Sequence, residues 1–303
     1  MIRLADFRPV ALGDKLLFES FYSKFPQSHS EYLFSSLVSW AHYTPVSFLL
    51  KDDDLILMHL KDGAPQFRPP IGERSAQVLR QVFDLAKADG GSPPVVAIDS
   101  KTKDWILSLF PNIKLSADRD FFDYVYLAKT LSELPGKPYL TLRNHLNSFR
   151  RKYEYSVEPI SSGNMEDART FLKRWCLWRD CSSSPMLEAE RVAVLYCMEH
   201  FAALGLSGIV LRIGGAIQAL TVYEALNSET AVIVFEKAMP EFDGIYPAIG
   251  NEAARILAKD FKFINRESDL GIAGLRTAKQ RLHPDHMEEL YYIAEDCLQL
   301  SFR

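Results

Sequence analysis

The stretch Ile245-Tyr-Pro-Ala-Ile-Gly-Asn-Glu-Ala-Ala-Arg-Ile-Leu257 decides the fold, because a fainter copy of it occurs earlier in the chain. The copy is Pro69–Leu79, and its first proline precedes Pro247 by 178 residues (247 minus 69). Both stretches follow strand-like runs and enter an apolar-periodic helix, so the pattern predicts one fold used twice. Aligned on these prolines, they share four further positions: Ile71 and Ile249, Gly72 and Gly250, Ala76 and Ala254, Leu79 and Leu257.

The glycine of each copy is expected at the start of a helix. There it would let a ligand approach exposed backbone N–H groups, which is typical of an anion site. An ordinary connection between a strand and a helix would use the same residue types. The pattern alone leaves both interpretations open for Gly72 and Gly250.

The same order of elements is expected in both halves: strand, two helices, antiparallel strands, glycine-containing loop, helix, strand, helix and strand. This order predicts an α/β fold with mixed, largely antiparallel sheets. Ser132–Pro138 is the expected linker, which gives domains at residues 1–135 and 136–303. In the second half, helices are expected at 165–179 and 185–203, strands at 207–213, 216–225 and 230–237, a loop at 239–250 and a helix at 251–259.

Composition is that of a soluble globular protein of 303 residues, with 48% hydrophobic and 24% charged residues. A net charge of −4 and a pI near 6.0 exclude a global basic field for DNA. No apolar run reaches the roughly 18 residues that span a bilayer, and the first residues do not resemble a signal peptide. The four cysteines form no C-x-x-C pair, so we expect thiols in a reducing cytoplasm and no metal site.

A family resemblance is carried by the run Asn265-Arg-Glu-Ser-Asp-Leu-Gly-Ile-Ala-Gly-Leu-Arg-Thr-Ala-Lys279, preceded by Phe235-Glu-Lys, Gly244-Ile-Tyr and Asn251-Glu. These residues resemble the family named for its similarity to the catalytic C-terminal domain of bacterial phosphatidylglycerol lysyltransferases. The resemblance covers most of the chain. It implies two tandem GNAT-like (N-acyltransferase-type) domains and a relation to aminoacyl-tRNA-dependent transferases that build peptidoglycan cross-bridges.

Polar residues after the buried strand that ends near 265 form the expected substrate-binding site, since α/β sheets present ligand groups at strand ends. Arg276 and Lys279 share a helix face and suit a phosphate or carboxylate. A salt-bridged structural cluster is the competing interpretation. The expected set is Gly250, Asn251, Asn265, Arg266, Glu267, Asp269, Arg276 and Lys279.

Acyl transfer to an amine or hydroxyl needs a base for the nucleophile and an acid for the leaving group. Glu236, at the end of a strand, is the candidate base, and Tyr246 is the candidate acid. A strand-end carboxylate and a packed tyrosine are the structural alternatives. The loop at 243–251 lacks the Q/R-x-x-G-x-G/A spacing of acyl-CoA-dependent GNAT enzymes, which favours aminoacyl-tRNA over acyl-CoA as donor.

A second basic stretch, at 143–152, is expected to be an amphipathic helix. Its polar face has Arg143, Arg150 and Lys152, which suit RNA or lipid phosphate, although a solvated helix face has the same pattern. The resulting hypothesis is a cytoplasmic acyltransferase acting on a small-molecule, lipid or peptide acceptor. The alternatives are a non-catalytic GNAT-fold protein that binds a phosphate-bearing ligand and an acetyl-CoA-dependent N-acetyltransferase.

Overall fold

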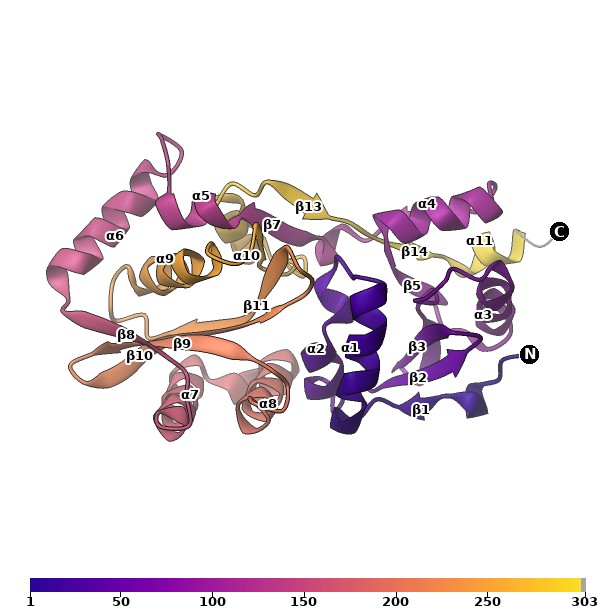
Figure 1. The fold of residues 1–303 in the computed structure, drawn as a ribbon, viewed down its shortest axis with the longest axis horizontal. Coiled ribbons are helices and arrows are strands. Elements are labelled where there is room, and N and C mark those ends of the chain that lie inside the picture. The colour runs from indigo at the N-terminus through magenta and orange to yellow at the C-terminus, as the bar shows by residue number, and fades with distance from the viewer. Residues whose placement is uncertain (301–303) are drawn as a thin grey trace. The chain divides into compact units, whose positions relative to one another are not determined.

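The computed structural model describes residues 1–300, and side chains up to residue 298. The chain forms two compact units (Figure 1). Unit 1 comprises Met1–Phe122 and the segment from Glu288 onward, and unit 2 comprises Asp123–Met287. The expected division between residues 135 and 136 falls inside unit 2, between helices α5 (Ala128–Glu133) and α6 (Leu140–Lys152).

Unit 1 is a mixed sheet with helices packed on it. The strand order is β1-β2-β3-β4-β5-β14-β6, and β4 and β5 are parallel. An acidic turn joins β2 to β3, with Asp52 and Asp53 in the left-handed region. The strands are Arg8–Pro9, Val46–Lys51, Asp54–Lys61, Ala64–Phe67, Val95–Asp99, Leu290–Ile293 and Ser116–Ala117, and the helices are α1 (Lys15–Lys24), α2 (Phe34–Ser39), α3 (Ala76–Asp89), α4 (Ser100–Leu109) and α11 (Glu295–Leu300).

Unit 2 has a second seven-stranded sheet, in the order β13-β7-β12-β11-β10-β9-β8. Figure 1 shows helices α7 (Met165–Arg179) and α8 (Pro185–Glu199) on one face of this sheet and α9 (Ile245–Leu257) on the other. Helix α10 (Ala273–Gln280) follows β12. The strands are His286–Glu288, Asp123–Leu127, Phe263–Asn265, Thr230–Ala238, Ala216–Ala225, Ser207–Ile213 and Tyr155–Pro159.

The two sheets have the same order, and each is completed by a strand from the other half of the sequence. In unit 1 the run β1 to β5 is followed by β14, which pairs antiparallel with β5. In unit 2 the run β8 to β12 is followed by β7, which pairs antiparallel with β12. The mixed, largely antiparallel α/β architecture is therefore confirmed. Because of this exchange, unit 1 combines two separate segments of the chain, whereas unit 2 is the single segment Asp123–Met287.

The beginning of α9 differs from expectation. The helix starts at Ile245 rather than at Asn251, so Gly250 lies inside the helix. Pro247 fits within the first turn, where a missing N–H costs no helical hydrogen bond. In the fainter copy, Gly72 precedes α3, which Ser75 caps by accepting from the Val78 N–H at 3.2 Å. The interpretation of Gly250 as a helix-start anion site is therefore wrong.

A disulfide joins Cys176, in the last turn of α7, to Cys181, with a Cα–Cα distance of 5.2 Å. The expectation of thiols at these two positions is wrong. Sequence reasoning relied on the missing C-x-x-C pair, but the left-handed residue Asp180 reverses the chain after α7 and returns Cys181 to Cys176.

Candidate functional site

A buried ion pair lies between β11 and α9. Arg266 Nη2 donates to Glu236 Oε1 at 2.9 Å, and the two side chains are 20% and 9% exposed. The second carboxylate oxygen, Glu236 Oε2, is buried and has no hydrogen-bond partner among the described residues. Burying an unpaired carboxylate oxygen is costly, so this oxygen marks a place where an external donor would be favourable.

Gly250 makes room for that pair. A Cβ at this position would lie 3.2 Å from Arg266 Nη1 and 3.5 Å from Glu236 Oε2. The first distance is shorter than an ordinary carbon–nitrogen contact. Gly250 thus lets α9 pack closely over the ion pair. Its role is steric, and its backbone N–H belongs to the helix interior.

Tyr246 lies in the first turn of α9 and is 39% exposed. Its hydroxyl lies near the Ala238 backbone and the Trp175 side chain. Burial of the hydroxyl raises the pKa of Tyr246, and the negative charge of Glu236 adds to this rise. The two candidate catalytic residues are therefore close enough to interact, and Tyr246 keeps its proton at neutral pH.

Lys279 stabilises the turn that carries Arg266. Its Nζ donates to the carbonyl oxygens of Arg266 and of Glu267, the latter at 3.2 Å. Burial lowers the pKa of Lys279 to about 8. The ammonium group therefore donates to backbone carbonyls. It does not project freely toward a phosphate, which is the role that the sequence had suggested.

Two further members of the predicted set stabilise the same turn. Asn265 is fully buried, donates to Asp123 Oδ2 at 2.7 Å and accepts from the Glu267 N–H at 2.7 Å. Glu267 has a φ of 56°, in the left-handed region. These contacts fix the backbone beyond β12, so both residues have a structural role in this conformation.

Asp269 and Arg276 form a bidentate pair, with Arg276 Nε and Nη2 at 2.9 and 2.8 Å from the two carboxylate oxygens. Tyr124 also donates to Asp269 Oδ2 at 2.7 Å, and the Gly271 N–H donates to Oδ1 at 3.0 Å. Asp269 is completely buried. Four donors on one carboxylate indicate the salt-bridged structural cluster that competed with the substrate-binding interpretation.

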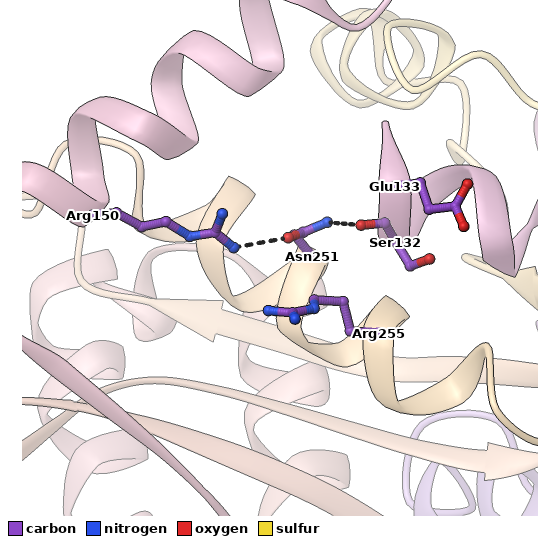
Figure 2. Close-up of a pocket in the computed structure, with 5 residues that line it drawn as sticks. All are labelled: Ser132, Glu133, Arg150, Asn251 and Arg255. Carbon is purple, nitrogen blue, oxygen red and sulfur yellow. Dashed lines mark hydrogen bonds between the residues drawn. The ribbon is translucent and has the colours of Figure 1, made fainter. Parts of the chain in front are cut away.

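Asn251 lies at a second site, away from the Arg266–Glu236 ion pair. Its side chain donates to the carbonyl oxygens of Leu131 and Ser132 at 2.9 and 3.0 Å and accepts from Arg150 Nη2 at 3.2 Å. These contacts border a pocket of about 420 Å³ formed by α5, α6 and α9. Figure 2 shows Arg150 and Arg255 extending toward one another beside Asn251, while the Glu133 carboxylate points away.

The other basic residues of α6 are not in this pocket. Arg143 donates to the carbonyl oxygens of Leu134 and Gly136 and so fixes the turn after α5. Lys152 is exposed, with its Nζ 5.2 Å from the centre of the Tyr153 ring. The structure therefore places Arg150 alone among these three beside a cavity.

Sequence reasoning missed the contacts on the other face of β11, opposite the ion pair. Trp175 is buried and donates from its indole to the Ala238 carbonyl at 3.1 Å. Lys237 forms a 2.6 Å salt bridge with Glu190, and its Nζ lies 4.4 Å from the centre of the Trp175 ring. The sequence does contain a signal for Lys237, which is a charged residue next to Glu236 on a buried strand. Because successive strand residues face opposite sides, the two charges must be accommodated on different faces of the sheet.

Among the described residues, no group of three or more His, Cys, Asp or Glu side chains is arranged to hold a metal ion. Within the same part of the chain, no helix is both long enough and apolar enough to cross a membrane.

Comparisons with known proteins agree with the architecture. A conserved protein of unknown function from Bacteroides thetaiotaomicron VPI-5482 is 30% identical, with a TM-score of 0.88 over 95% of this chain and 98% of that chain. The C-terminal domain of a putative lysylphosphatidylglycerol synthetase from Agrobacterium fabrum has a TM-score of 0.66 at 12% identity, covering 96% and 95% of the two chains. FemX has a TM-score of 0.54 at 9% identity, covering 95% and 98%.

The likenesses at 12% and 9% identity concern the fold, which is two-lobed and GNAT-like. No curated protein sequence matches the chain. The family model described as "Phosphatidylglycerol lysyltransferase, C-terminal" matches residues 22–294. That region is most of the sequence, and the protein therefore belongs to the phosphatidylglycerol lysyltransferase C-terminal family.

Proposed function

We propose that unit 2 transfers an aminoacyl group from an ester-linked carrier to an amine or hydroxyl acceptor. The observation that supports this most is the buried Glu236 carboxylate, with one oxygen held by Arg266 and the other without a partner among the described residues. A carboxylate fixed in this way is suited to act as a general base. Tyr246 is close enough for its pKa to respond to the Glu236 charge.

In the proposed reaction, Glu236 Oε2 accepts the proton of the acceptor nucleophile as that atom attacks the ester carbonyl. The carbonyl π electrons move onto oxygen to give a tetrahedral intermediate. The intermediate collapses by breaking the bond to the carrier oxygen, which takes its proton from the Tyr246 hydroxyl. The proton on Glu236 then returns to Tyr246 through solvent, so acid and base are restored.

The packing of α6 favours an aminoacyl-tRNA donor over acyl-CoA. A Cβ on Gly244, which precedes α9, would lie 3.1 Å from Phe149 Cβ and 3.2 Å from the His145 carbonyl oxygen. Helix α6 therefore covers the start of α9, where a pyrophosphate would need open backbone N–H groups. The name of the family refers to lysyl transfer to phosphatidylglycerol, so lysyl-tRNA and this lipid are the first pair to test.

The test is transfer of a radiolabelled aminoacyl group from a panel of aminoacyl-tRNAs to phosphatidylglycerol vesicles and to small amines. Glu236→Gln and Tyr246→Phe should each lower the transfer rate by roughly 10²–10⁴-fold, the usual contribution of a general base or acid. Glu229→Gln, on the exposed β10–β11 connection, and Tyr223→Phe, on β10, are matched controls and should keep the wild-type rate. Equal rates for all four variants would contradict the assignment.

A second candidate function, binding of a phosphate-bearing ligand without catalysis, is favoured by the pocket of α5, α6 and α9. Arg150 and Arg255 reach it from two helices, and both contact Glu252, at 3.3 and 3.6 Å. Calorimetric titration with inorganic phosphate and with a short single-stranded RNA would test it. Arg150→Ala and Arg255→Ala should weaken binding, while Arg281→Ala, outside the pocket, should not. Tight binding without transfer from any donor would favour this candidate.

A further inference from the structure

A second pocket, of about 500 Å³, lies between α7 and α8 on the face of the unit 2 sheet that Figure 1 shows opposite α9. Its walls combine aliphatic and aromatic side chains with charged ones, and the half-buried Lys237–Glu190 salt bridge belongs to its lining. The disulfide between Cys176 and Cys181 also belongs to this lining. Cys181 is 4% exposed and Cys176 is half-buried, and both line this pocket, which is the side from which an external thiol would approach the bond.

The residue next to this disulfide connects it to the proposed reaction. Trp175 donates its indole N–H to the Ala238 carbonyl at 3.1 Å, and its side chain lies close enough to the Tyr246 hydroxyl to affect its pKa. The last turn of α7, which the disulfide ties to Cys181, therefore places Trp175 beside the candidate acid. A change in the conformation of this turn would move Trp175 and so alter the surroundings of Tyr246.

Besides the disulfide, short-range contacts hold the turn after α7. Ser182 and Ser183 donate to Asp180, and the Ser183 N–H donates to the Asp180 carbonyl at 3.0 Å. Asp180 itself is in the left-handed conformation, which costs about 1 kcal/mol for a non-glycine residue. A turn of this kind, at a helix end and exposed to solvent, belongs to the part of a fold that opens most easily.

We propose that Cys176–Cys181 is a thiol–disulfide exchange site whose redox state sets the position of Trp175 and, through it, of Tyr246. A small thiolate attacks the Cys176 sulfur, forms a mixed disulfide and releases Cys181 as the leaving thiolate, which takes a proton from solvent. A second thiolate then attacks the sulfur of the small thiol, releases Cys176 and leaves as the oxidised small-molecule disulfide. The protein gains two electrons and two protons, which the two small thiols supply.

The experiment begins with the covalent state. Iodoacetamide labelling followed by peptide mass spectrometry should modify Cys176 and Cys181 only after treatment with dithiothreitol. Tryptophan fluorescence of the native full chain should change on reduction, and the change should be absent from Trp175→Phe. The double variant Cys176→Ser/Cys181→Ser should have the fluorescence of the reduced protein in either condition. Cys297→Ser, in unit 1, is the matched control and should respond as wild type does.

The activity measurement rests on the proposed function, whereas labelling and fluorescence do not. Reduction should lower the transfer rate about fivefold, the equivalent of one ordinary hydrogen bond, and should leave the rate of the double variant unchanged. Absence of transfer from every donor, with the fluorescence response intact, would contradict the proposed function alone. Labelling of both cysteines before reduction, or reduction with no change in the Trp175 signal, would overturn the exchange site.

Discussion

Arg266 and Glu236 are joined at 2.9 Å beneath a helix that could not lie so close if residue 250 had a side chain. The three residues come from β11, α9 and the end of β12, so the ion pair forms only when these elements pack together. The contact is the centre of the proposed site, and it leads directly to two tests of stability.

Gly250→Ala should fail to stabilise the protein, although alanine in a helix interior is about 1 kcal/mol better than glycine. The added methyl group would press on the Arg266 guanidinium and offset this gain. Gly274→Ala, in α10, has no atom within 4 Å of its added Cβ and should raise stability by about 0.5–1 kcal/mol. Urea denaturation measures both. Equal gains for the two variants would mean that Gly250 is not crowded.

Arg266→Met should destabilise unit 2 by about 3–5 kcal/mol, because it leaves the Glu236 carboxylate buried without its cation. The double variant Arg266→Met/Glu236→Leu removes both charges and should recover most of that loss. A double-mutant cycle in urea gives the coupling free energy. A coupling below about 0.5 kcal/mol would show that the pair behaves like an exposed surface pair.

The lowered pKa of Lys279 predicts that the free energy of unfolding changes at alkaline pH. Burial lowers the pKa of Lys279 to about 8 from its ordinary value of 10.5, so the folded protein binds fewer protons than the unfolded chain between these values. Stability contributed by this group therefore rises with pH in that window. The free energy of unfolding of wild type minus that of Lys279→Met should rise by about 2 kcal/mol from pH 8 to pH 10. A difference that stays flat would contradict the lowered pKa.

The raised pKa of Asp54, in unit 1, predicts the opposite change of stability with pH. This residue is fully buried against Gly72, and burial raises the pKa of its carboxyl to about 6 from 3.8. The folded state then binds the proton more tightly, so stability falls as pH rises from about 4 to 6. Asp54→Asn should therefore stabilise the protein by about 2–3 kcal/mol more at pH 7.5 than at pH 4.

The neighbouring Asp53 provides the control for that measurement, since it is exposed and its left-handed backbone accommodates asparagine. Asp53→Asn should change stability equally at both pH values. Thermal unfolding monitored by circular dichroism at pH 4 and pH 7.5 is sufficient. A pH-independent effect of Asp54→Asn would indicate that folding does not raise the pKa of this carboxyl.

Local patterns predicted most of the elements correctly. The helix Met165–Arg179 and the strands Ser207–Ile213 and Ala216–Ala225 have the expected bounds, and Gly214 and Gly215 form the turn between these strands with φ values of 58° and 80°. Helical periodicity and turn residues act over a few positions, so they can be read from neighbours in the sequence. The start of α9 was missed because proline and glycine are typical of loops, yet Pro247 fits a first turn and Gly250 fits a close contact.

The sequence by itself determined the family, the α/β class and the chemical types gathered between residues 236 and 279. Which of those groups are paired with one another was decided by tertiary structure alone. Asp269 and Arg276 satisfy each other, Lys279 is used by two carbonyls, and one oxygen of Glu236 keeps no partner among the described residues. Hydrogen-bond partners in this cluster come from strands and helices far apart in the chain, and their pairing depends on the packing distance, which no local pattern encodes.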